Sequence, residues 1–217
     1  MIDGVEVAVG AEAVCVTAEH ELVVLSSAFA GGGLGRARTI VNLHVPKNFP
    51  CSDAEITVGA FVRRQGLPPP WIGMLTSAWT EKAQTAVETS NGIRALVVAT
   101  VGLSNASAAG LTGRAELAPG TINTIVVVDA DPEPAAMVNL IMTVTEVKTA
   151  LLLEAGMKSV DGHAATGTST DAMVVAATAR GPRCRFGGPL SELGWVVARA
   201  AREALGTGVR RWLEDHR

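Results

Sequence analysis

Hydrophobic and polar residues alternate along the first 45 residues in the way that is typical of β-strands. The alternating stretches are bounded by Gly, Pro or charged residues, and they cover residues 6 to 19, 21 to 28 and 38 to 45. We predict that they form an antiparallel sheet at the N-terminus. Short apolar runs closed by small polar residues predict further strands at residues 72 to 79, 83 to 90 and 94 to 106.

In the second half of the chain, the spacing of hydrophobic residues predicts helices as well as strands. Residues 121 to 130, TINTIVVVDA, are typical of a fully buried strand, and a turn at ADPEP follows. A helix is then predicted from about Pro134 to Ala155, ended by Gly156, before residues 169 to 178 return as a strand. This order of strand, helix and strand indicates a parallel crossover.

A second helix is predicted from the end of the sequence. It begins near Pro189 and Ser191 and continues through Leu205, with apolar residues near helical spacing. We expect the GTG at residues 206 to 208 to break it before a short charged final turn or helix.

These elements predict the fold class. Strands predominate before residue 130 and the helices come later, so we expect an α+β protein with mixed or antiparallel β-sheets and packed helices. The alternative is a three-layer α/β arrangement. A hydrophobic fraction of 48% against 18% charged residues supplies material for a thick core. We find no linker long enough to separate domains, which predicts a single domain over residues 1 to 217.

Charge and cysteine content narrow the function classes. A formal net charge of −3, without a basic stripe, argues against nucleic-acid binding. The most apolar long window carries Glu146 and Lys148 near its middle, which argues against a membrane partner. Three dispersed cysteines predict neither a disulfide framework nor a metal site, and the N-terminus does not resemble a secretory signal. We expect a cytoplasmic protein, and the oligomeric state is left open, a homo-oligomer included.

The stretch SSAFAGGGLGRARTIVNLH, residues 26 to 44, combines serines, glycines and the pair Asn42 and His44. A bare turn between two strands is one interpretation, and a functional site is the other. The glycines lack the Lys-Ser or Lys-Thr of a phosphate loop. Asn42 and His44 alternate with apolar residues, so both lie on one strand face, which is either solvated or functional. Of the four histidines, His44 is the best placed as an acid or base.

Several polar residues outside this stretch can be either functional or structural. On the predicted helix, Lys148 falls on the apolar face, where an ammonium needs a partner or a function unless its stem reaches an edge, whereas Glu146 falls on the solvated face. Asp171 follows a run of small hydroxyl residues, which is either a site or a Ser/Thr turn. Asp129 and Asp131 can hold magnesium, but a D-x-D at a strand end is usually a turn.

The order of these stretches resembles one family, the adenosylcobinamide amidohydrolases of corrinoid salvage. The matching motifs are SSA with GGGLG and VNLHVPK, GMLTSA, VATVGLSNA, PGTINTI, TEVKTALL, TGTSTDA and GGPLSELGWVVARA, in this order over roughly residues 21 to 203. No single motif is specific, but their order is. Val147 is a departure, because the family pattern has Ala there.

The resemblance implies an enzyme that hydrolyses the secondary amide between adenosylcobyric acid and its aminopropanol arm and releases 1-amino-2-propanol. A corrinoid is then the substrate, and no cofactor or metal is required. Such an enzyme needs a nucleophile or activated water, donors for the oxyanion and an acid for the leaving amine. A non-catalytic corrinoid-binding protein is the alternative, although the D-x-H-x-x-G signature of corrinoid carriers is missing.

Site residues follow from side-chain chemistry at the matching motifs. We expect Ser27 to be the nucleophile, His44 its base and then the acid, and Asn42 or the glycine amides the oxyanion donors. A water activated by Glu146 or Asp171 is the alternative. The expected substrate-binding residues are Ser26, Gly31, Gly32, Gly33, Asn105, Thr121, Asn123, Lys148, Thr168 and Asp171.

Overall fold

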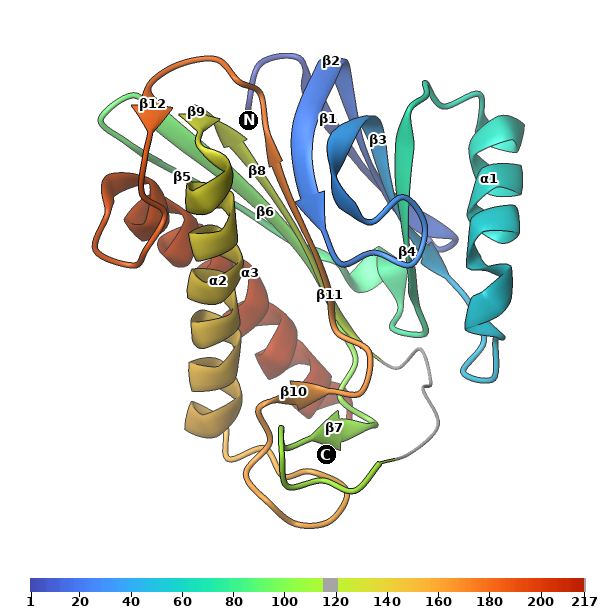
Figure 1. The fold of residues 1–217 in the computed structure, drawn as a ribbon. Coiled ribbons are helices and arrows are strands. Elements are labelled where there is room, and N and C mark those ends of the chain that lie inside the picture. The colour runs from blue at the N-terminus through green and yellow to red at the C-terminus, as the bar shows by residue number, and fades with distance from the viewer. Residues whose placement is uncertain (115–120, 217) are drawn as a thin grey trace.

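The computed structural model describes residues 1 to 114 and 121 to 216, and Figure 1 shows their arrangement. The main strands are β1 (Val5–Val9), β2 (Ala13–Ser26), β3 (Gly33–His44), β4 (Trp71–Thr76), β5 (Gln84–Ser90), β6 (Ile93–Val101), β8 (Ile122–Asp129) and β11 (Ala172–Ala177). Two short pairs join β7 (Ala106–Ser107) to β10 (Gly167–Thr168) and β9 (Asp131–Pro132) to β12 (Arg183–Cys184). The helices are α1 (Ala54–Gln65), α2 (Pro134–Glu154) and α3 (Glu192–Asp215), with 3-10 turns at Cys51–Asp53 and Thr80–Lys82.

The main strands form one mixed sheet in the order β4-β3-β2-β11-β8-β6-β5, with β1 paired to β2. Strands β1, β2 and β3 are antiparallel, as the sequence predicts. Two pairs are parallel, β3 with β4 and β8 with β11, and a helix connects the strands of each. The sheet is therefore mixed, and the predicted parallel crossover from residue 121 to 178 is confirmed.

Strand β2 joins two halves of this sheet. Its first part pairs with β1 and β3, its last residues pair with β11, and the register with β3 shifts between Thr17 and Leu22. The two halves face each other, because apolar residues of both belong to one core cluster that includes Val14, Ile40, Met74, Val98, Ile125 and Val174. The prediction of separate strands at residues 6 to 19 and 21 to 28 is wrong, since β2 is continuous through His20 and the chain turns instead at residues 10 to 12, between β1 and β2.

Helices cover the outer faces of both halves, with α1 on the side of β4 and α2 and α3 on the other (Figure 1). The protein is thus built as four layers, helix, sheet, sheet and helix. The expected α+β class with a mixed sheet and packed helices is confirmed, and the three-layer alternative is wrong.

Helix α1 was not predicted from the sequence. Its buried residues Ala54, Val58, Phe61 and Val62 follow helical spacing and pack on β3 and β4, while the polar residues between them obscure the pattern. Gly66 ends the helix with φ of 63°, the left-handed conformation usual after a helix C-terminus.

Helix α2 matches its prediction, from Pro134 to the turn at Gly156. It is the one helix of the described residues that is long and apolar enough to cross a membrane by length and composition. Its inner face, with Met137, Leu140 and Val144 fully buried, packs against the sheet and α3 as a core helix does.

Helix α3 begins as predicted, because Ser191 caps it by accepting a hydrogen bond from the Gly194 amide at 3.1 Å. The predicted break at residues 206 to 208 is wrong, since α3 continues to Asp215. A Cβ on Gly208 would lie 2.6 Å from Val101 Cγ2, so glycine is required here by the close approach of α3 to β6.

Candidate functional site

Two buried asparagines meet between the halves of the sheet. Asn123 on β8 donates a hydrogen bond from Nδ2 to Asn42 Oδ1 on β3 at 2.7 Å, and another to the Leu75 carbonyl at 2.9 Å. Asn42 in turn donates from Nδ2 to Thr100 Oγ1 at 2.8 Å. Asn42, Thr100 and Asn123 are each 2% exposed or less. Amides so deeply buried need fixed partners, and the facing strands supply them.

Thr121 links the asparagines to a carboxylate. Its hydroxyl lies 3.3 Å from Asn123 Oδ1 and 3.5 Å from Asp171 Oδ1, and the residue is fully buried. One hydroxyl hydrogen can be donated to only one of these two acceptors at a time. Thr121 can therefore direct its proton either to the amide or to the carboxylate.

Asp171 precedes β11 and is held by several donors. Its Oδ1 accepts the Ile122 amide at 3.1 Å and the Thr168 hydroxyl, and its Oδ2 accepts the Thr168 amide at 3.2 Å. Lys148 of α2 forms an ion pair with Oδ2, and the two side chains are 12% and 18% exposed. These contacts fix both carboxylate oxygens beside Thr121.

Lys148 reaches Asp171 because Gly167 leaves room between them. A Cβ at Gly167 would lie 2.6 Å from Asp171 Oδ2 and 3.1 Å from Lys148 Nζ. The ammonium on the apolar helix face thus has a partner, which was one of the two interpretations of this residue. We call Asn42, Thr100, Thr121, Asn123, Lys148, Thr168 and Asp171 the rim cluster.

The rim cluster unites five of the expected substrate-binding residues, Thr121, Asn123, Lys148, Thr168 and Asp171, with Asn42. Thr100 was missed. Its only signal in the sequence is a hydroxyl at the end of the apolar run RALVVATV, which also fits an ordinary strand end. Chemically, the cluster combines hydroxyl groups, a carboxylate with its counterion and amide donors, and acyl transfer uses groups of these kinds.

Ser26 and Ser27 lie at the end of β2, next to β11. Ser26 is buried, and its Oγ accepts the Ala28 amide at 2.9 Å. Ser27 is exposed, and its Oγ accepts the Met173 amide at 3.0 Å, two residues from Asp171. Ser26 therefore stabilises the local turn, whereas Ser27 joins the end of β2 to the start of β11.

The glycine loop after Ser27 is a tight turn against β4. Ala30 exchanges two backbone hydrogen bonds with Gly73, at 3.1 and 2.9 Å. Gly31 and Gly33 have φ of 71° and 102°, and a Cβ at Gly32 would lie 2.5 Å from the Ala28 carbonyl. The backbone alone therefore requires these glycines, which accounts for their presence without a ligand.

His44 lies at the end of β3, half-buried, on the strand that carries Asn42. Its Nδ1 lies 3.0 Å from the Ala78 carbonyl, and its ring stacks on Trp79 at 5.3 Å. A carbonyl only accepts, so Nδ1 carries the proton and Nε2 is left as the basic nitrogen of the neutral ring. Within the part of the chain that the structure describes, no hydrogen bond joins His44 to Ser27, whose hydroxyl contacts Met173 instead.

Glu146, Asn105 and Asp129 are not members of the rim cluster. Glu146 is exposed on α2, as its helical angle predicts. Asn105 donates to Ser169 Oγ at 2.6 Å, two residues from Asp171. Asp129 accepts the Thr178 hydroxyl at 2.8 Å and pairs with Arg180, which fits the turn interpretation. Over residues 1 to 114 and 121 to 216, no group of three or more His, Cys, Asp or Glu is placed to hold a metal ion.

Three large apolar side chains are exposed on segments that also carry candidate residues. Phe29 lies two residues after Ser27, Trp79 stacks on His44, and Leu111 lies in the loop whose Ala109 amide bonds Thr166 Oγ1. Their exposed fractions are 39%, 59% and 64%. Large exposed apolar residues of this kind are available to contact an apolar ligand.

Comparison with solved structures finds a similar fold. The fold is similar to that of a β-aminopeptidase from Burkholderia sp., with a TM-score of 0.56, 12% identity, and coverage of 96% of this chain and 84% of that one. At this identity, the likeness concerns the fold alone.

The sequence comparisons are more specific. A curated adenosylcobinamide amidohydrolase from Methanosarcina mazei is 30% identical over 187 residues, which cover 82% of this chain and 86% of the relative. The family model described as adenosylcobinamide amidohydrolase matches residues 1 to 217. The resemblance drawn from the ordered motifs is thereby confirmed, and the chain belongs to the adenosylcobinamide amidohydrolase family.

Proposed function

We propose that this amidohydrolase cleaves the aminopropanol amide of adenosylcobinamide at the rim cluster, with Thr121 as nucleophile. The observation that carries the proposal is the contact of one hydroxyl, that of Thr121, with both the Asp171 carboxylate and the Asn42–Asn123 amide pair. Family membership supports the substrate, and the exposed side chains of Phe29 and Trp79 suit contact with a large apolar ring.

The proposed reaction gives Thr121, Asp171, Lys148 and Asn42 separate roles. Thr121 Oγ1 attacks the amide carbon as its proton passes to Asp171 Oδ1, and Lys148 balances the carboxylate charge. Asn42 Nδ2 carries a second hydrogen besides the one given to Thr100, and this hydrogen is donated to the oxyanion. The proton on Asp171 then moves to the departing nitrogen, which leaves as 1-amino-2-propanol, and water hydrolyses the threonyl ester.

Access to the cluster is from the side of Asp171. Lys148 and Asp171 are its partly exposed members, whereas Thr121 is fully buried in the substrate-free protein. The scheme therefore requires the side chains that cover Thr121 to be displaced when the corrinoid binds. Thr168 is the less suitable nucleophile, because its hydroxyl contacts Asp171 and not the asparagine pair.

A second mechanism uses Ser27 and His44, as expected from the sequence. The orientation of His44 favours it, because the Ala78 carbonyl holds Nδ1 and leaves Nε2 as a base. Its weakness is the hydrogen bond that engages Ser27 Oγ with the Met173 amide. A water activated by Glu146 is a third scheme, for which the exposed position of Glu146 offers little support.

Single substitutions distinguish the three schemes. We expect Thr121→Ala to lower turnover of adenosylcobinamide at least about a hundredfold while corrinoid binding is kept, the scale for loss of a group that acts in the transition state. Thr121→Ser should retain part of the activity, and Thr168→Ser is the matched control. Turnover is measured as adenosylcobyric acid by mass spectrometry, and binding by a separate titration.

Measured beside them, Ser27→Ala, His44→Ala and Glu146→Gln identify the scheme that applies. Full activity of Thr121→Ala, together with loss of turnover in both Ser27→Ala and His44→Ala, would replace the threonine scheme by the serine and histidine scheme. Loss of cleavage only in Glu146→Gln would instead show that a carboxylate-activated water attacks the amide.

The expected cytoplasmic location is kept as part of this proposal. Cys15 and Cys184 are free and buried, which suits a reducing compartment. A homo-oligomer likewise stays a prediction, to be measured by light scattering.

A further inference from the structure

Helix α2 carries an exposed uncharged stripe on the side that faces away from the sheet. Val138, Met142 and Leu153 are 49%, 55% and 49% exposed, and between them lie the exposed Thr145 and the half-buried Thr149. At about 100° of turn per residue, these five side chains fall within roughly 80° of arc. They therefore form one line along the helix, which we call the α2 stripe.

Charged residues are few on this helix. Of its 21 residues, only Glu146, Lys148 and Glu154 are charged. Lys148 is paired with Asp171 and Glu154 with Arg202, so only Glu146, at the edge of the α2 stripe, has no partner among the ion pairs of the described residues. The solvated face of a helix normally carries charged and polar residues. The α2 stripe is thus typical of a surface that another molecule covers.

The apolar surface continues beside the first turns of α2. Thr143 donates a hydrogen bond to the Gly187 carbonyl at 3.0 Å, and a Cβ at Gly187 would lie 2.3 Å from the Ala136 carbonyl oxygen. The segment around Gly187 therefore runs directly along the helix. Phe186 and Leu190 in this segment are 63% and 97% exposed.

The area of the α2 stripe shows what a stable contact must include. A helix of this length is about 30 Å long and 10 Å wide, so the stripe covers roughly 300 Å². A stable protein interface buries about 800 Å² on each partner. The segment at residues 185 to 190 must therefore belong to the same interface.

The spacing of the α2 stripe fits a second copy of the same helix. A two-fold axis that passes between residues 145 and 146 relates two antiparallel copies of α2. It places Val138 of one copy opposite Leu153 of the other, and Met142 opposite Thr149. The stripe is therefore complementary to itself, as the interface of a two-fold symmetric dimer has to be.

Electrostatics favours the antiparallel arrangement. The first turn of α2 has no acidic residue and its last turn has no basic residue, so the partial charges at the helix ends have no partners on the helix itself. An antiparallel copy brings the positive end of each helix beside the negative end of the other. The unfavourable element is Glu146, which lies near its own copy at the solvated edge of the contact, where salt weakens the repulsion.

The two ends of α2 also differ in shape. A shallow groove between the C-terminal half of α2 and α3 is lined by Leu151, Glu154, Arg199, Arg202, Glu203 and Arg210. By helical angle, Glu154 lies on the same side of α2 as Ala136, which contacts the segment around Gly187. In an antiparallel pair, the groove of one copy thus faces the exposed Phe186 of the other, and arginine side chains attract an aromatic ring.

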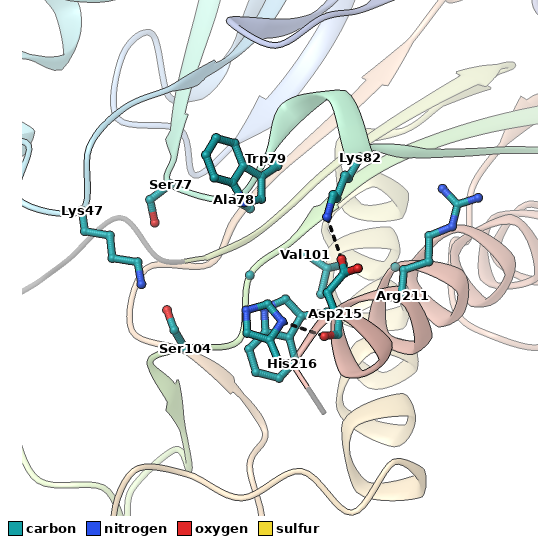
Figure 2. A pocket seen from close by; sticks show the side chains of 13 residues that line it. Lys47, Ser77, Ala78, Trp79, Lys82, Val101, Ser104, Arg211, Asp215 and His216 are labelled. Carbon is teal, nitrogen blue, oxygen red and sulfur yellow. Dashed lines mark hydrogen bonds and ion pairs between the residues drawn. The ribbon is translucent and has the colours of Figure 1, made fainter.

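Another group of exposed aromatic residues has a different setting. Trp79 and Trp212 line a pocket of about 110 Å³ at the C-terminal part of α3 (Figure 2). A hollow of this kind fits a small group. The α2 stripe instead lies on the convex surface of a helix, which packs into the surface of another helix.

We propose that the α2 stripe and residues 185 to 190 form the interface of a symmetric homodimer, in which the α2 helices of two copies pack antiparallel. A lipid surface is the less suitable partner. Helices that lie on membranes are rich in Lys and Arg beside their apolar face, whereas the residue beside the α2 stripe is Glu146.

The oligomeric state is measured by light scattering after gel filtration, over a dilution series. We expect the wild type to have twice the chain mass of 22.4 kDa. Met142→Glu should raise the dissociation constant of the dimer at least about a hundredfold, because it places like charges in the contact. Ile56→Glu is the matched control, since Ile56 is 74% exposed on α1, on the opposite side of the protein (Figure 1). Thermal unfolding verifies that both variants are folded.

Cross-linking tests the arrangement of the helices. Val138→Cys and Leu153→Cys are treated with a short bismaleimide, separately and as a mixture. We expect cross-linked dimers mainly in the mixture, because two copies of residue 138 lie about 22 Å apart along antiparallel helices. Thr145→Cys, next to the axis, should cross-link to its own copy. The wild type, which has three cysteines, is the control for links through native thiols.

Four outcomes would overturn the proposal. A monomer at every concentration would exclude the dimer, and equal weakening by Met142→Glu and Ile56→Glu would place the contact elsewhere. Cross-linking of Val138→Cys to its own copy would show that the helices are not antiparallel. Flotation of a monomer with vesicles of phosphatidylcholine and phosphatidylglycerol, lost in Met142→Glu, would assign the α2 stripe to a lipid surface. None of these measurements involves cleavage of a substrate, so they are independent of the proposed function.

Discussion

Asn42 on β3 accepts a hydrogen bond from Asn123 on β8 across the space between the two halves of the sheet, at 2.7 Å. The two residues are 81 positions apart in the chain. Each has apolar neighbours on the same strand face, Ile40 and Ile125, that belong to the core between the halves. The polar site therefore begins where this apolar core ends.

This contact makes a prediction about stability. Asn42→Ala and Asn123→Ala should each lower the free energy of unfolding by about 1 to 3 kcal/mol, because each leaves buried partners without a hydrogen bond. In the double variant, the free energy of unfolding should fall by less than the sum of the two single losses, because each single substitution already removes the hydrogen bond between Asn42 and Asn123. Urea unfolding measures all three. Strict additivity would show that the two amides do not interact in solution.

The pair of Lys148 and Asp171 should be worth more than a surface ion pair. Lys148→Met leaves an almost buried carboxylate without its counterion, and we expect a loss of about 3 kcal/mol in the free energy of unfolding. Arg202→Ala is the matched control, because its partner Glu154 is 58% exposed and such pairs contribute less than about 1 kcal/mol. Equal losses in the two variants would contradict the buried character of the first pair.

Two glycines of α3 predict opposite effects of the same substitution. Gly208→Ala should destabilise the protein by about 1 to 3 kcal/mol, because the added methyl group overlaps Val101 on β6. Gly206→Ala should be neutral or stabilising by up to about 1 kcal/mol, since its Cβ would lie 3.4 Å or more from other atoms and alanine favours a helix. Thermal unfolding of the two variants checks this. Similar melting temperatures would argue against close packing at Gly208.

Cys15 gives a prediction about alkaline pH. Burial, with a smaller contribution from Glu12, raises the pKa of its thiol from 9.0 to about 11. In the unfolded chain the thiol loses its proton near pH 9, whereas in the folded protein it keeps the proton to about pH 11. The unfolded state thus binds fewer protons in this window, and stability falls as the pH rises from 9 to 11.

The measurement compares the wild type with Cys15→Ala by urea unfolding at pH 8, 9, 10 and 11. Part of the alkaline loss of stability should disappear in the variant. The thiol should also react slowly with iodoacetamide at pH 9 in the folded protein. Identical pH profiles for the two proteins would rule out a contribution from Cys15.

Much of the fold could be predicted because its elements depend on local sequence patterns. The long-range contacts between these elements could not be predicted. The β-branched run from Ile122 to Val128 and the cap at Ser191 act within a few residues, so the sequence shows them directly. By contrast, glycines at 206 and 208 indicate a helix break unless the nearby β6 is known, because the close approach that requires Gly208 involves a strand more than a hundred positions away.

For the candidate site too, individual residues could be predicted from the sequence but their contacts could not. The sequence motifs indicated that Asn42, Thr121, Asn123, Lys148 and Asp171 are candidate site residues. Their spacing in the sequence did not predict that they lie together. Their convergence depends on two sheet halves facing each other, which places β3 opposite β8, and on Gly167, which lets α2 reach the start of β11. Side-chain chemistry alone favoured Ser27 with His44, which are close in sequence.

The position of β2 has a consequence for how the protein is made. This strand lies near the N-terminus, yet its last residues pair with β11, which comes from Ala172–Ala177. During synthesis on a ribosome, the edge of β2 that β11 will cover therefore stays open until about four fifths of the chain has emerged. Such an exposed edge attracts strands of other nascent chains. We expect the yield of correctly folded protein to depend on the speed of translation and on chaperones that shield this edge.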